Sequence, residues 1–508
     1  MKNRSARKGR AGAAGESGQA LVPALIFLLL GGIGLFVAFN SFQISSAKIK
    51  MQNTADAAAY SVAVLQARDY NYSAYLNRAM VANQATAAQM VSMKSAVDML
   101  YGVFTPGISG QLVAQYGRGD IATNMLNRRN NTVAPIRDKW TSLLPEAMRS
   151  LDEINRSLSG AEYQYHQTTL SIVPGFAESI TGQNDPYTHV SAGAFFDDAG
   201  ESMMAAWRSY TTQFDPHTGS TDRFADVATD KGTLDGFTRI RGRSWFWIGL
   251  KDYCGNDINL EYTGSGGTQL RPDRGGWQAL DGSMTKFSVA AACDKTDPPL
   301  QPISWTGPEG MGGAGNGNYL TYESWQGYGG YLNFGRGGSV AGNVPSAMKE
   351  QYDRGPGESL YANSELWPYN DVTVQSTDNA ASPITVRIER DSSTLVRDQR
   401  LQGGGRMKVR NDNSPLMAMA SGQAYFSRPN EKGASAALGL MMIDHISGSA
   451  KQFWTRADGK TEYASLFSPY WDARLAPLTD AQRTALSGIA SPSGADARGG
   501  LNTSEDER

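Results

Sequence analysis

The chain has 508 residues and a formal net charge of -2, and 19% of its residues are charged. This length is sufficient for two or three domains with buried cores. Because there is no overall basic charge, the composition gives no indication of nucleic acid as a partner.

A single uninterrupted helix is predicted over residues 19–100. The run from Gln19 to Ala47 contains no charged residue, and Ala20–Phe39 is almost entirely apolar, which satisfies the roughly 20 residues that a membrane-spanning helix needs. No glycine follows Gly34 until position 102, and no proline follows Pro23 until position 106, so nothing interrupts the helical pattern. A helix of about 80 residues would be about 120 Å long, at about 1.5 Å per residue.

Charged residues on either side of the apolar run predict its orientation. The basic residues before it are Lys2, Arg4, Arg7, Lys8 and Arg10. Only Lys48 and Lys50 follow closely, so the positive-inside rule places the N-terminus in the cytoplasm and the bulk of the chain across the membrane. A cleaved secretory signal is the alternative. Its apolar region would normally span about 7–15 residues, and the best small-residue site, Ser45-Ser46-Ala47, lies inside the helical pattern.

Beyond the membrane the helix is predicted to continue as an amphipathic helix. A seven-residue frame consists of Met51, Ala55, Ala58, Val62, Leu65, Asp69, Tyr72, Leu76, Ala79, Asn83, Thr86, Met90, Met93, Val97 and Leu100. Most of these positions are apolar or aromatic, which favours a helix over a strand. The other faces carry little charge, whereas an exposed helix usually carries more. The helix therefore either packs closely among other helices or is covered by later segments of its own chain.

A family resemblance rests on the order of these features. After the basic leader come Gly18-Gln19-Ala20-Leu21-Val22, the apolar span and Gln52-Asn53-Thr54-Ala55-Asp56-Ala57-Ala58-Ala59. Over about residues 15–65 this order resembles the N-terminal region of TadE/TadG-like proteins of tight-adherence (Tad, or Flp) pilus assembly in bacteria. A looser similarity covers Gly422–Pro429 and Leu466–Leu475.

The resemblance implies a structural component of a type IV-like pilus system, anchored in the inner membrane. Its expected partners are pilins or other assembly subunits, with self-association through the N-terminal helix. Type IV-like prepilins are cut after a glycine and carry a glutamate at the fifth mature position. Cleavage between Gly18 and Gln19 would place Pro23 there. That departure puts incorporation as a standard pilin in doubt and fits an anchored TadG-like accessory component better.

The predicted fold class is α+β. The expected regions are a cytoplasmic leader (1–18), a transmembrane helix (19–44), its extracytoplasmic continuation (45–100), a mainly helical region (101–235), an irregular glycine- and aromatic-rich β-containing domain (236–402) and a C-terminal mixed region with a disordered tail (403–508). In the helical region we expect breaks near Pro135 and Pro145, an end at Pro174-Gly175 and a further helix over Ala192–Phe214. Strand signals occur at Phe237–Arg241, Trp245–Ile248, Phe287–Val289 and Ile384–Ile388.

Three later stretches have a distinctive composition. Thirteen of the thirty-six residues from Gly307 to Gly342 are glycine, interleaved with aromatic residues, which fits either loops of an irregular β domain or a protein-binding surface. Gly403–Gly405 is typical of a linker. Residues 434–446 favour a helix too short to span a membrane, and residues 491–508 are expected to be disordered.

Cys254 and Cys293 are the only cysteines. In a cytosolic protein they would be ordinary thiols. Outside the cytoplasm they are candidates for a disulfide that closes a loop of about 40 residues, worth about 4 kcal/mol in the chain-entropy model. Both interpretations remain open from the sequence.

No catalytic, cofactor or metal signature is found, so the sequence predicts no enzyme. The four histidines, His166, His189, His217 and His445, lack the i, i+4 spacing of a helical zinc pair. Asp281-Gly282-Ser283-Met284-Thr285 offers oxygen ligands for a divalent cation and faintly resembles the metal-site loop of von Willebrand factor A domains, although an ordinary turn is favoured. Arg118-Gly119-Asp120 matches a cell-adhesion tripeptide, a match expected by chance.

Three functional hypotheses follow from the sequence. The leading one is a single-pass, structural component of Tad pilus assembly. The second is a membrane-anchored adhesin with a divalent-cation site at the Asp281 loop. The third, an anchored enzyme, is disfavoured by the missing catalytic motifs.

Overall fold

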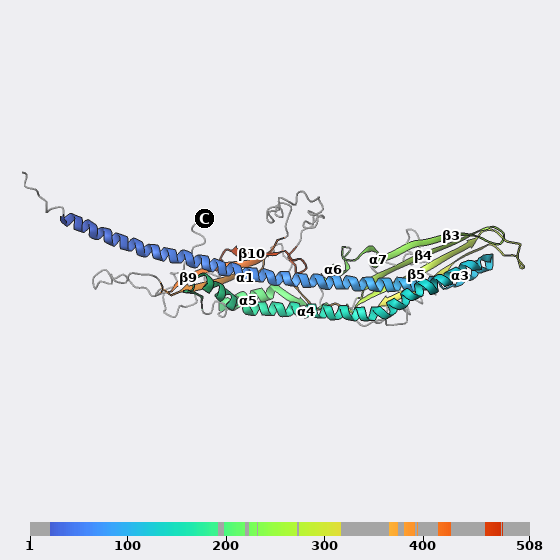
Figure 1. Cartoon of the computed structure of the whole chain (residues 1–508), viewed down its shortest axis with the longest axis horizontal. Helices are drawn as coiled ribbons and strands as arrows, with labels where there is room; N and C mark the ends of the chain where they lie inside the picture. Colours follow the sequence, from blue (N-terminus) through green and yellow to red (C-terminus); the bar gives the residue numbers. More distant parts are fainter. Residues whose placement is uncertain are drawn as a thin grey trace, which may run out of the picture.

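The computed structural model describes residues 21–191, 198–218, 223–230, 232–271, 274–315, 365–373, 380–391, 394, 415–427, 463–478 and 480. Over these residues the chain is a mixed helix-and-sheet protein, in which a long N-terminal apolar helix is followed by a strand-rich part. The molecule is elongated along that helix, α1 (Leu21–Val103), with a second long helix and the sheets beside it (Figure 1).

Helix α1 is continuous for 83 residues, which confirms the prediction of one uninterrupted helix. Most of its large apolar side chains are exposed from Leu21 to Phe42, and its first buried residue is Ala47. The helix thus passes from exposed to partly buried within about a turn and a half. We call the end of the body near Ala47 proximal and the end near Val103 distal.

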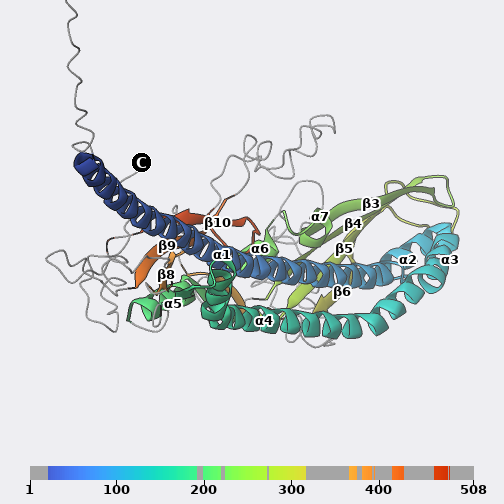
Figure 2. The ribbon, with the colours of Figure 1, turned by 60° about the vertical axis from the view of Figure 1, so that its left-hand side comes forward.

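A series of short helices reverses the chain at the distal end. They are α2 (Ile108–Val113), the π-helical segment η1 (Ala114–Arg118), α3 (Gly119–Arg128) and a second π-helical segment, η2 (Arg129–Val133). Gly117 takes a φ of 87°, a conformation that glycine adopts without a steric penalty, and kinks η1. Helix α4 (Ala134–Asn184) then runs back along α1 for 51 residues (Figure 2).

The predicted breaks in this region are wrong. Pro135 lies in the first turn of α4, where proline is tolerated, and Pro145 and Pro174 lie inside the helix. An interior proline costs about 3 kcal/mol, so packing must outweigh it. The side chains that flank these two prolines and are buried at 5% exposure or less are Leu144, Met148, Val173 and Ala177. Burial of this stripe keeps α4 continuous.

The distal body is an antiparallel four-stranded sheet in the part of the chain that the structure describes. Its strands follow chain order: β3 (Ile240–Lys251), β4 (Asp257–Leu270), β5 (Trp277–Val289) and β6 (Ile303–Gly315). One core cluster joins this sheet to the end of α1 and to the short helices, with Val103, Tyr116 and Phe287 among its buried residues.

The proximal body contains a second antiparallel sheet, of strand order β1-β8-β9-β10. Its strands are β1 (Thr188–Val190), β8 (Ile384–Arg390), β9 (Leu416–Phe426) and β10 (Trp471–Ala476). A third pairing joins β2 (Thr211–Phe214) to β7 (Tyr369–Val372). Because all these strands pack directly or indirectly on α1, the helix forms the axis of the core.

Local pattern misassigned parts of three further segments. The predicted helix over Ala192–Phe214 contains helix α5 (Asp198–Tyr210) followed by strand β2, whose partner β7 lies about 160 residues later in the chain. Helix α6 spans Arg223–Thr229, and the start of the predicted strand at Phe237 is helix α7 (Gly236–Arg239). The third segment, at Asp281, belongs to strand β5 rather than to a turn.

Several predictions concern residues outside the described part of the chain. They are the leader with its cleavage position at Gly18 and Gln19, the glycine-rich stretch from residue 316 onward, the linker at 403–405, the helix at 434–446 and the tail at 491–508. The beginning of the glycine-rich stretch, Gly307 to Gly315, forms most of strand β6.

Candidate functional site

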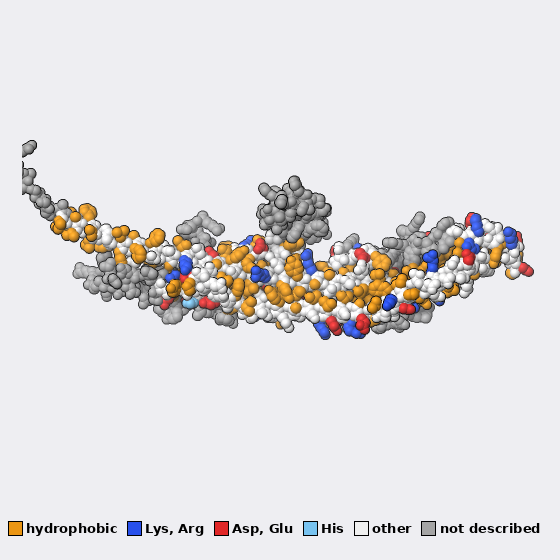
Figure 3. Space-filling model, viewed as in Figure 1, with side chains coloured by type: hydrophobic (Ala, Val, Ile, Leu, Met, Phe, Trp, Pro, Cys, Tyr) orange, Lys and Arg blue, Asp and Glu red, His pale blue; other side chains and the backbone are white. Residues whose placement is uncertain are grey.

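The first candidate site is the exposed apolar segment of α1, Leu21–Phe42. Among the described residues this helix is the one long and apolar enough to cross a membrane, and no residue of its most apolar window is buried. Consecutive residues such as Leu28, Leu29 and Leu30 are 58–75% exposed, so the segment has no polar face. Its length, about 33 Å at 1.5 Å per residue, matches the roughly 30 Å of a hydrocarbon core. Figure 3 shows this apolar surface extending beyond the body.

Charged residues join α1 to the body directly beyond this segment. Lys50 Nζ lies 3.2 Å from Asp185 Oδ1, and Arg390 Nη1 lies 2.9 Å from Asp185 Oδ2. Burial alone would raise the pKa of Asp185, but hydrogen bonds from Thr188, Lys50 and the backbone N–H of Tyr187, together with Arg390, hold it below its usual value. These contacts connect the end of α4 and strand β8 to the first buried turns of α1.

One face of the rest of α1 is covered by its own chain, in agreement with the second interpretation of its low charge, whereas Tyr60, Tyr75 and Met93 on its other faces are exposed. Met51, Ala55, Ala58 and Val62 of the predicted seven-residue frame are fully buried. Later frame positions such as Leu65 and Tyr72 are only partly buried. From there the fully buried stripe shifts to residues that the apolar frame omits, among them Gln66, Ser73, Asn77 and Gln84. We call these four residues the polar stripe.

Amides of the polar stripe hold distant strands and loops through their backbones. Gln66 Oε1 accepts a hydrogen bond from the Ala424 N–H at 2.9 Å. Asn77 Nδ2 donates to the carbonyl oxygens of Asn370, at 2.8 Å, and Leu466, at 2.7 Å. These hydrogen bonds satisfy buried backbone groups that would otherwise be costly. The polar stripe therefore fixes the strands on the helix.

Further along α1, Gln84 makes one hydrogen bond to a backbone carbonyl and one to a side chain. Its Nε2 donates to the Glu365 carbonyl oxygen at 2.9 Å, and its Oε1 accepts from Trp277 Nε1 at 2.8 Å. The sequence signal for these residues was available, because Asn77 and Gln84 stand seven residues apart on an alanine-rich helix. The seven-residue frame of apolar positions does not include either residue, so this spacing was not used in the prediction.

Glycine in the strands allows the sheets to approach α1 closely. A Cβ atom at Gly422 of β9 would lie 2.3 Å from the Ala59 carbonyl oxygen. In β6 the corresponding distances are 2.5 Å from Gly310 to the Met99 oxygen and 1.9 Å from Gly312 to the Ser95 oxygen. Small residues on the helix and glycines on the strands thus form the contact surface.

The described parts of the segments that carry the sequence resemblance lie next to one another. Phe426 of β9 pairs with Trp471 of β10, and Gly422 pairs with Leu475, so the two C-terminal segments are neighbouring strands. Both pack on α1, where Gln52 Nε2 donates to the Met419 carbonyl oxygen at 3.2 Å. The motif that begins at Gln52 therefore belongs to the surface that receives these strands.

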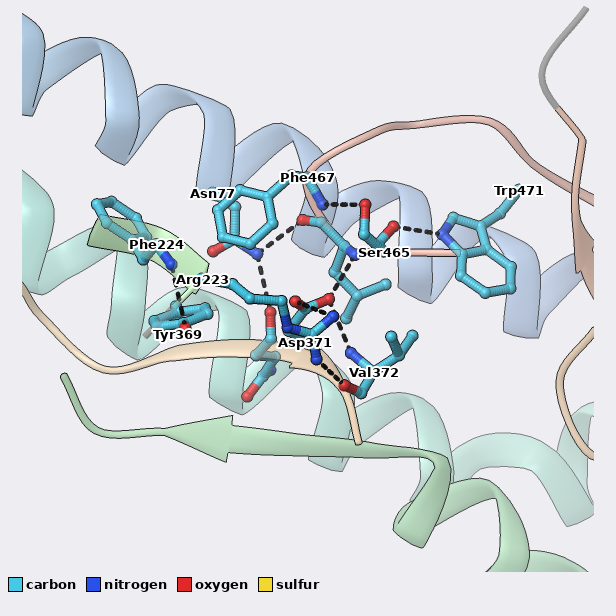
Figure 4. A network of polar contacts seen from close by, with 11 residues as sticks. Asn77, Arg223, Phe224, Tyr369, Asp371, Val372, Ser465, Phe467 and Trp471 are labelled. Carbon is cyan, nitrogen blue, oxygen red and sulfur yellow. Dashed lines mark hydrogen bonds and ion pairs between the residues drawn. The ribbon is translucent and has the colours of Figure 1, made fainter. Parts of the chain in front are cut away.

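A second candidate site is a group of buried ionisable residues between α1, α4 and β7. Asp371 Oδ1 accepts hydrogen bonds from the N–H groups of Val372 and Leu466, both at 2.8 Å, and its Oδ2 lies 3.0 Å from Arg223 Nη1 (Figure 4). Burial raises the pKa of Asp371 to about 6, against the opposite effect of Arg223 and these N–H groups.

Asp69, His166 and Glu162 complete this group. His166 Nδ1 lies 2.6 Å from Asp69 Oδ2, and Glu162 Oε2 accepts the Asn370 N–H at 3.1 Å. Burial raises the pKa of Glu162 well above its usual value, more than the hydrogen bonds from Asn370 and Ser73 lower it. We call Asp69, Glu162 and Asp371 the carboxyl cluster. No local sequence pattern marks these three acids as a group.

The residues predicted from sequence as metal or adhesion sites are not brought together. Asp281 lies within β5 at 1% exposure, and the described residues contain no group of three or more His, Cys, Asp or Glu side chains that could hold a metal ion. Arg118 and Asp120 pair with each other at 2.8 Å. His189 lies 3.3 Å from Glu178 on the surface, whereas His445 is outside the described part.

The two cysteines lie at the distal end of the sheet. Cys254 follows β3, Cys293 follows β5, and a disulfide joins them. The neighbouring Asp252 accepts hydrogen bonds from the N–H groups of Cys254 and Asn256, at 2.8 and 2.7 Å, which orders the turn between β3 and β4. This crosslink joins the β3–β4 loop to the β5–β6 loop at the distal end.

The chain matches no protein-family model, no curated protein and no solved structure.

Proposed function

We propose that the chain is a membrane-anchored structural component of a Tad (Flp, type IV-like) pilus-assembly system. The observation that carries the proposal is the exposed apolar segment, Leu21–Phe42, which continues as one helix into the core of the body. Such a surface is stable within lipid and costly in water. The family association rests on the sequence resemblance around residues 15–65.

In this proposal the N-terminus lies in the cytoplasm and the body on the extracytoplasmic side of the inner membrane. The role is to bind pilins or other assembly subunits rather than to catalyse a reaction. Association through α1 is favoured at residues before Ala47, because one face of the later part of the helix is already covered by its own chain. Gly31, Gly32 and Gly34 have open space beside them and allow a neighbouring helix to approach.

The experiment is piliation of the parent bacterium. Deletion of the gene should abolish Tad pili, and the wild-type chain should restore them. A variant with Leu28→Lys and Leu29→Lys should not restore them, because two charges at the centre of a span cost about 5–7 kcal/mol. Leu143→Lys, at a 59% exposed position of α4, is the matched control and should retain membrane association. Normal pili in the deletion strain would contradict the assignment.

The adhesin alternative gains no support among the described residues. Its cation site required a loop at Asp281, whereas this residue lies in a buried strand.

A further inference from the structure

The carboxyl cluster links three separate parts of the proximal body. Asp69 comes from α1, Glu162 from α4 and Asp371 from β7, and each carboxyl is at most 1% exposed. The charges of Asp69 and Asp371 both act on Glu162, which places the three acids within electrostatic reach of one another. In a dry interior such like charges repel strongly unless a proton or a cation neutralises them.

The surrounding described elements supply few compensating charges. Arg223 of α6 pairs with Asp371, and Nδ1 of His166 on α4 contacts Asp69, a contact that is ionic only when the imidazole is protonated. The other titratable groups that face this interior are the phenols of Tyr70, Tyr210 and Tyr369, which carry no positive charge. No cation within the described residues pairs with Glu162.

Contacts around Glu162 fit a protonated carboxyl. Its Oε2 accepts a hydrogen bond from the Asn370 N–H, and a hydrogen bond from Ser73 also reaches this carboxyl, whereas neither its Oε1 nor Asp69 Oδ1 accepts a hydrogen bond of good geometry from the described residues. An ionised carboxylate in such a place would be poorly compensated. A neutral acid avoids this penalty while keeping the contact with β7.

We infer that the carboxyl cluster is a proton-dependent latch, which holds α4 and β7 against α1 while Glu162 carries a proton and weakens when that proton is lost. Loss of the proton leaves uncompensated negative charge where the three elements meet. The elements then separate locally, beginning with α4 around Glu162 and β7 around Asn370. This device would couple the shape of the proximal body to the acidity of its surroundings.

The sign of the effect follows from linkage. The pKa of Glu162 is raised in the closed state, so the closed state binds the proton more tightly than the open state. The stability that the proton confers is complete below the pKa of the open, solvated carboxyl. It is lost progressively as the pH rises towards the pKa of the closed state. Opening therefore increases with pH.

The test is hydrogen exchange of the purified full chain in detergent micelles, read out by mass spectrometry. In peptides covering residues 155–170 and 366–372, the equilibrium constant for local opening should be at least tenfold larger at pH 8 than at pH 5, after correction for intrinsic exchange. Glu162→Gln should reduce this rise severalfold, and adding Asp371→Asn should abolish it. Glu178→Gln, at an exposed position of the same helix, should retain it fully.

Two results would overturn the inference. One is a wild-type chain whose opening does not rise with pH. The other is a His166→Gln variant that abolishes the rise while Glu162→Gln retains it, which would assign the effect to the histidine. If Glu162→Gln does not fold, Asp69→Asn gives an independent reading. Removal of that neighbouring charge lowers the pKa of Glu162. The increase of local opening with pH should therefore be smaller in this variant and should end at a lower pH.

Discussion

Gly312 of β6 lies directly against the backbone of Ser95 in α1. A Cβ atom at position 312 would stand 1.9 Å from the Ser95 carbonyl oxygen, far inside van der Waals contact. The same relationship recurs at Gly310 and at Gly422. Sheet and helix therefore meet backbone to backbone, and side-chain size at these positions determines how closely the two layers pack.

Gly312→Ala should destabilise the protein by about 1–3 kcal/mol, the usual range for overpacking. Chemical denaturation of the full chain, followed by circular dichroism, measures the change. The control is Gly160→Ala in α4, where the added Cβ meets no atom within 4 Å. It should stabilise the helix by up to about 1 kcal/mol. Equal effects of the two variants would refute the close contact.

Asn77→Ala should destabilise the proximal body by about 2–4 kcal/mol, because it leaves the buried carbonyl groups of Asn370 and Leu466 without their donor. Hydrogen exchange should increase selectively in residues 365–373 and 463–470. Asn184→Ala removes one exposed hydrogen bond at the end of α4 and should change stability by less than about 0.5 kcal/mol. If hydrogen exchange in the Asn77 variant increased equally along the whole chain, Asn77 would not hold these segments in particular.

Reduction of the disulfide should loosen the distal end. The cysteines are 39 residues apart in sequence, so the chain-entropy model assigns the crosslink about 4 kcal/mol. Peptide mapping without reductant should recover the residues around Cys254 and Cys293 in one crosslinked peptide. The double variant Cys254→Ser/Cys293→Ser should lower the unfolding midpoint and expose the loops at 252–256 and 290–302. Two free thiols in protein exported from the cytoplasm would contradict the structure.

Asp371 should make stability fall with rising pH. Its pKa of about 6 in the folded state lies above the value of 3.8 for a fully solvated aspartic acid. Folding therefore favours the protonated acid, and this contribution is lost between about pH 4 and pH 6, with an upper limit of about 3 kcal/mol. Denaturation of the wild type and of Asp371→Asn at several pH values measures it. The variant will be less stable overall, because Arg223 loses its partner, but its pH dependence in this range should be flatter.

The continuity of α1 was predictable because it depends on local sequence. Nothing between Gly34 and Gly102 interrupts the helix, and the apolar run before Phe42 exceeds what a buried core helix needs. Strands β5 and β8 were signalled in the same way by the β-branched and aromatic residues at Phe287–Val289 and Ile384–Ile388.

Features that depend on distant partners were not predictable from local pattern. Pro145 and Pro174 remain helical because α4 has 51 residues packed along α1. Thr211 begins a strand because Val372 lies opposite it. The polar stripe was obscured because Asn77 and Gln84 have no apolar character, although tertiary hydrogen bonds make them core residues. The carboxyl cluster likewise assembles residues separated by about 90–300 positions.

The most direct test of the membrane anchor is proteolysis of intact spheroplasts that produce the full chain with an N-terminal epitope tag. We expect added protease to digest the body from residue 47 onward, while the tag survives on a membrane-bound fragment that contains the exposed apolar segment. The tag should become accessible only after detergent is added. A body that resists protease until the membrane is dissolved, or a chain recovered in the soluble fraction, would contradict the account.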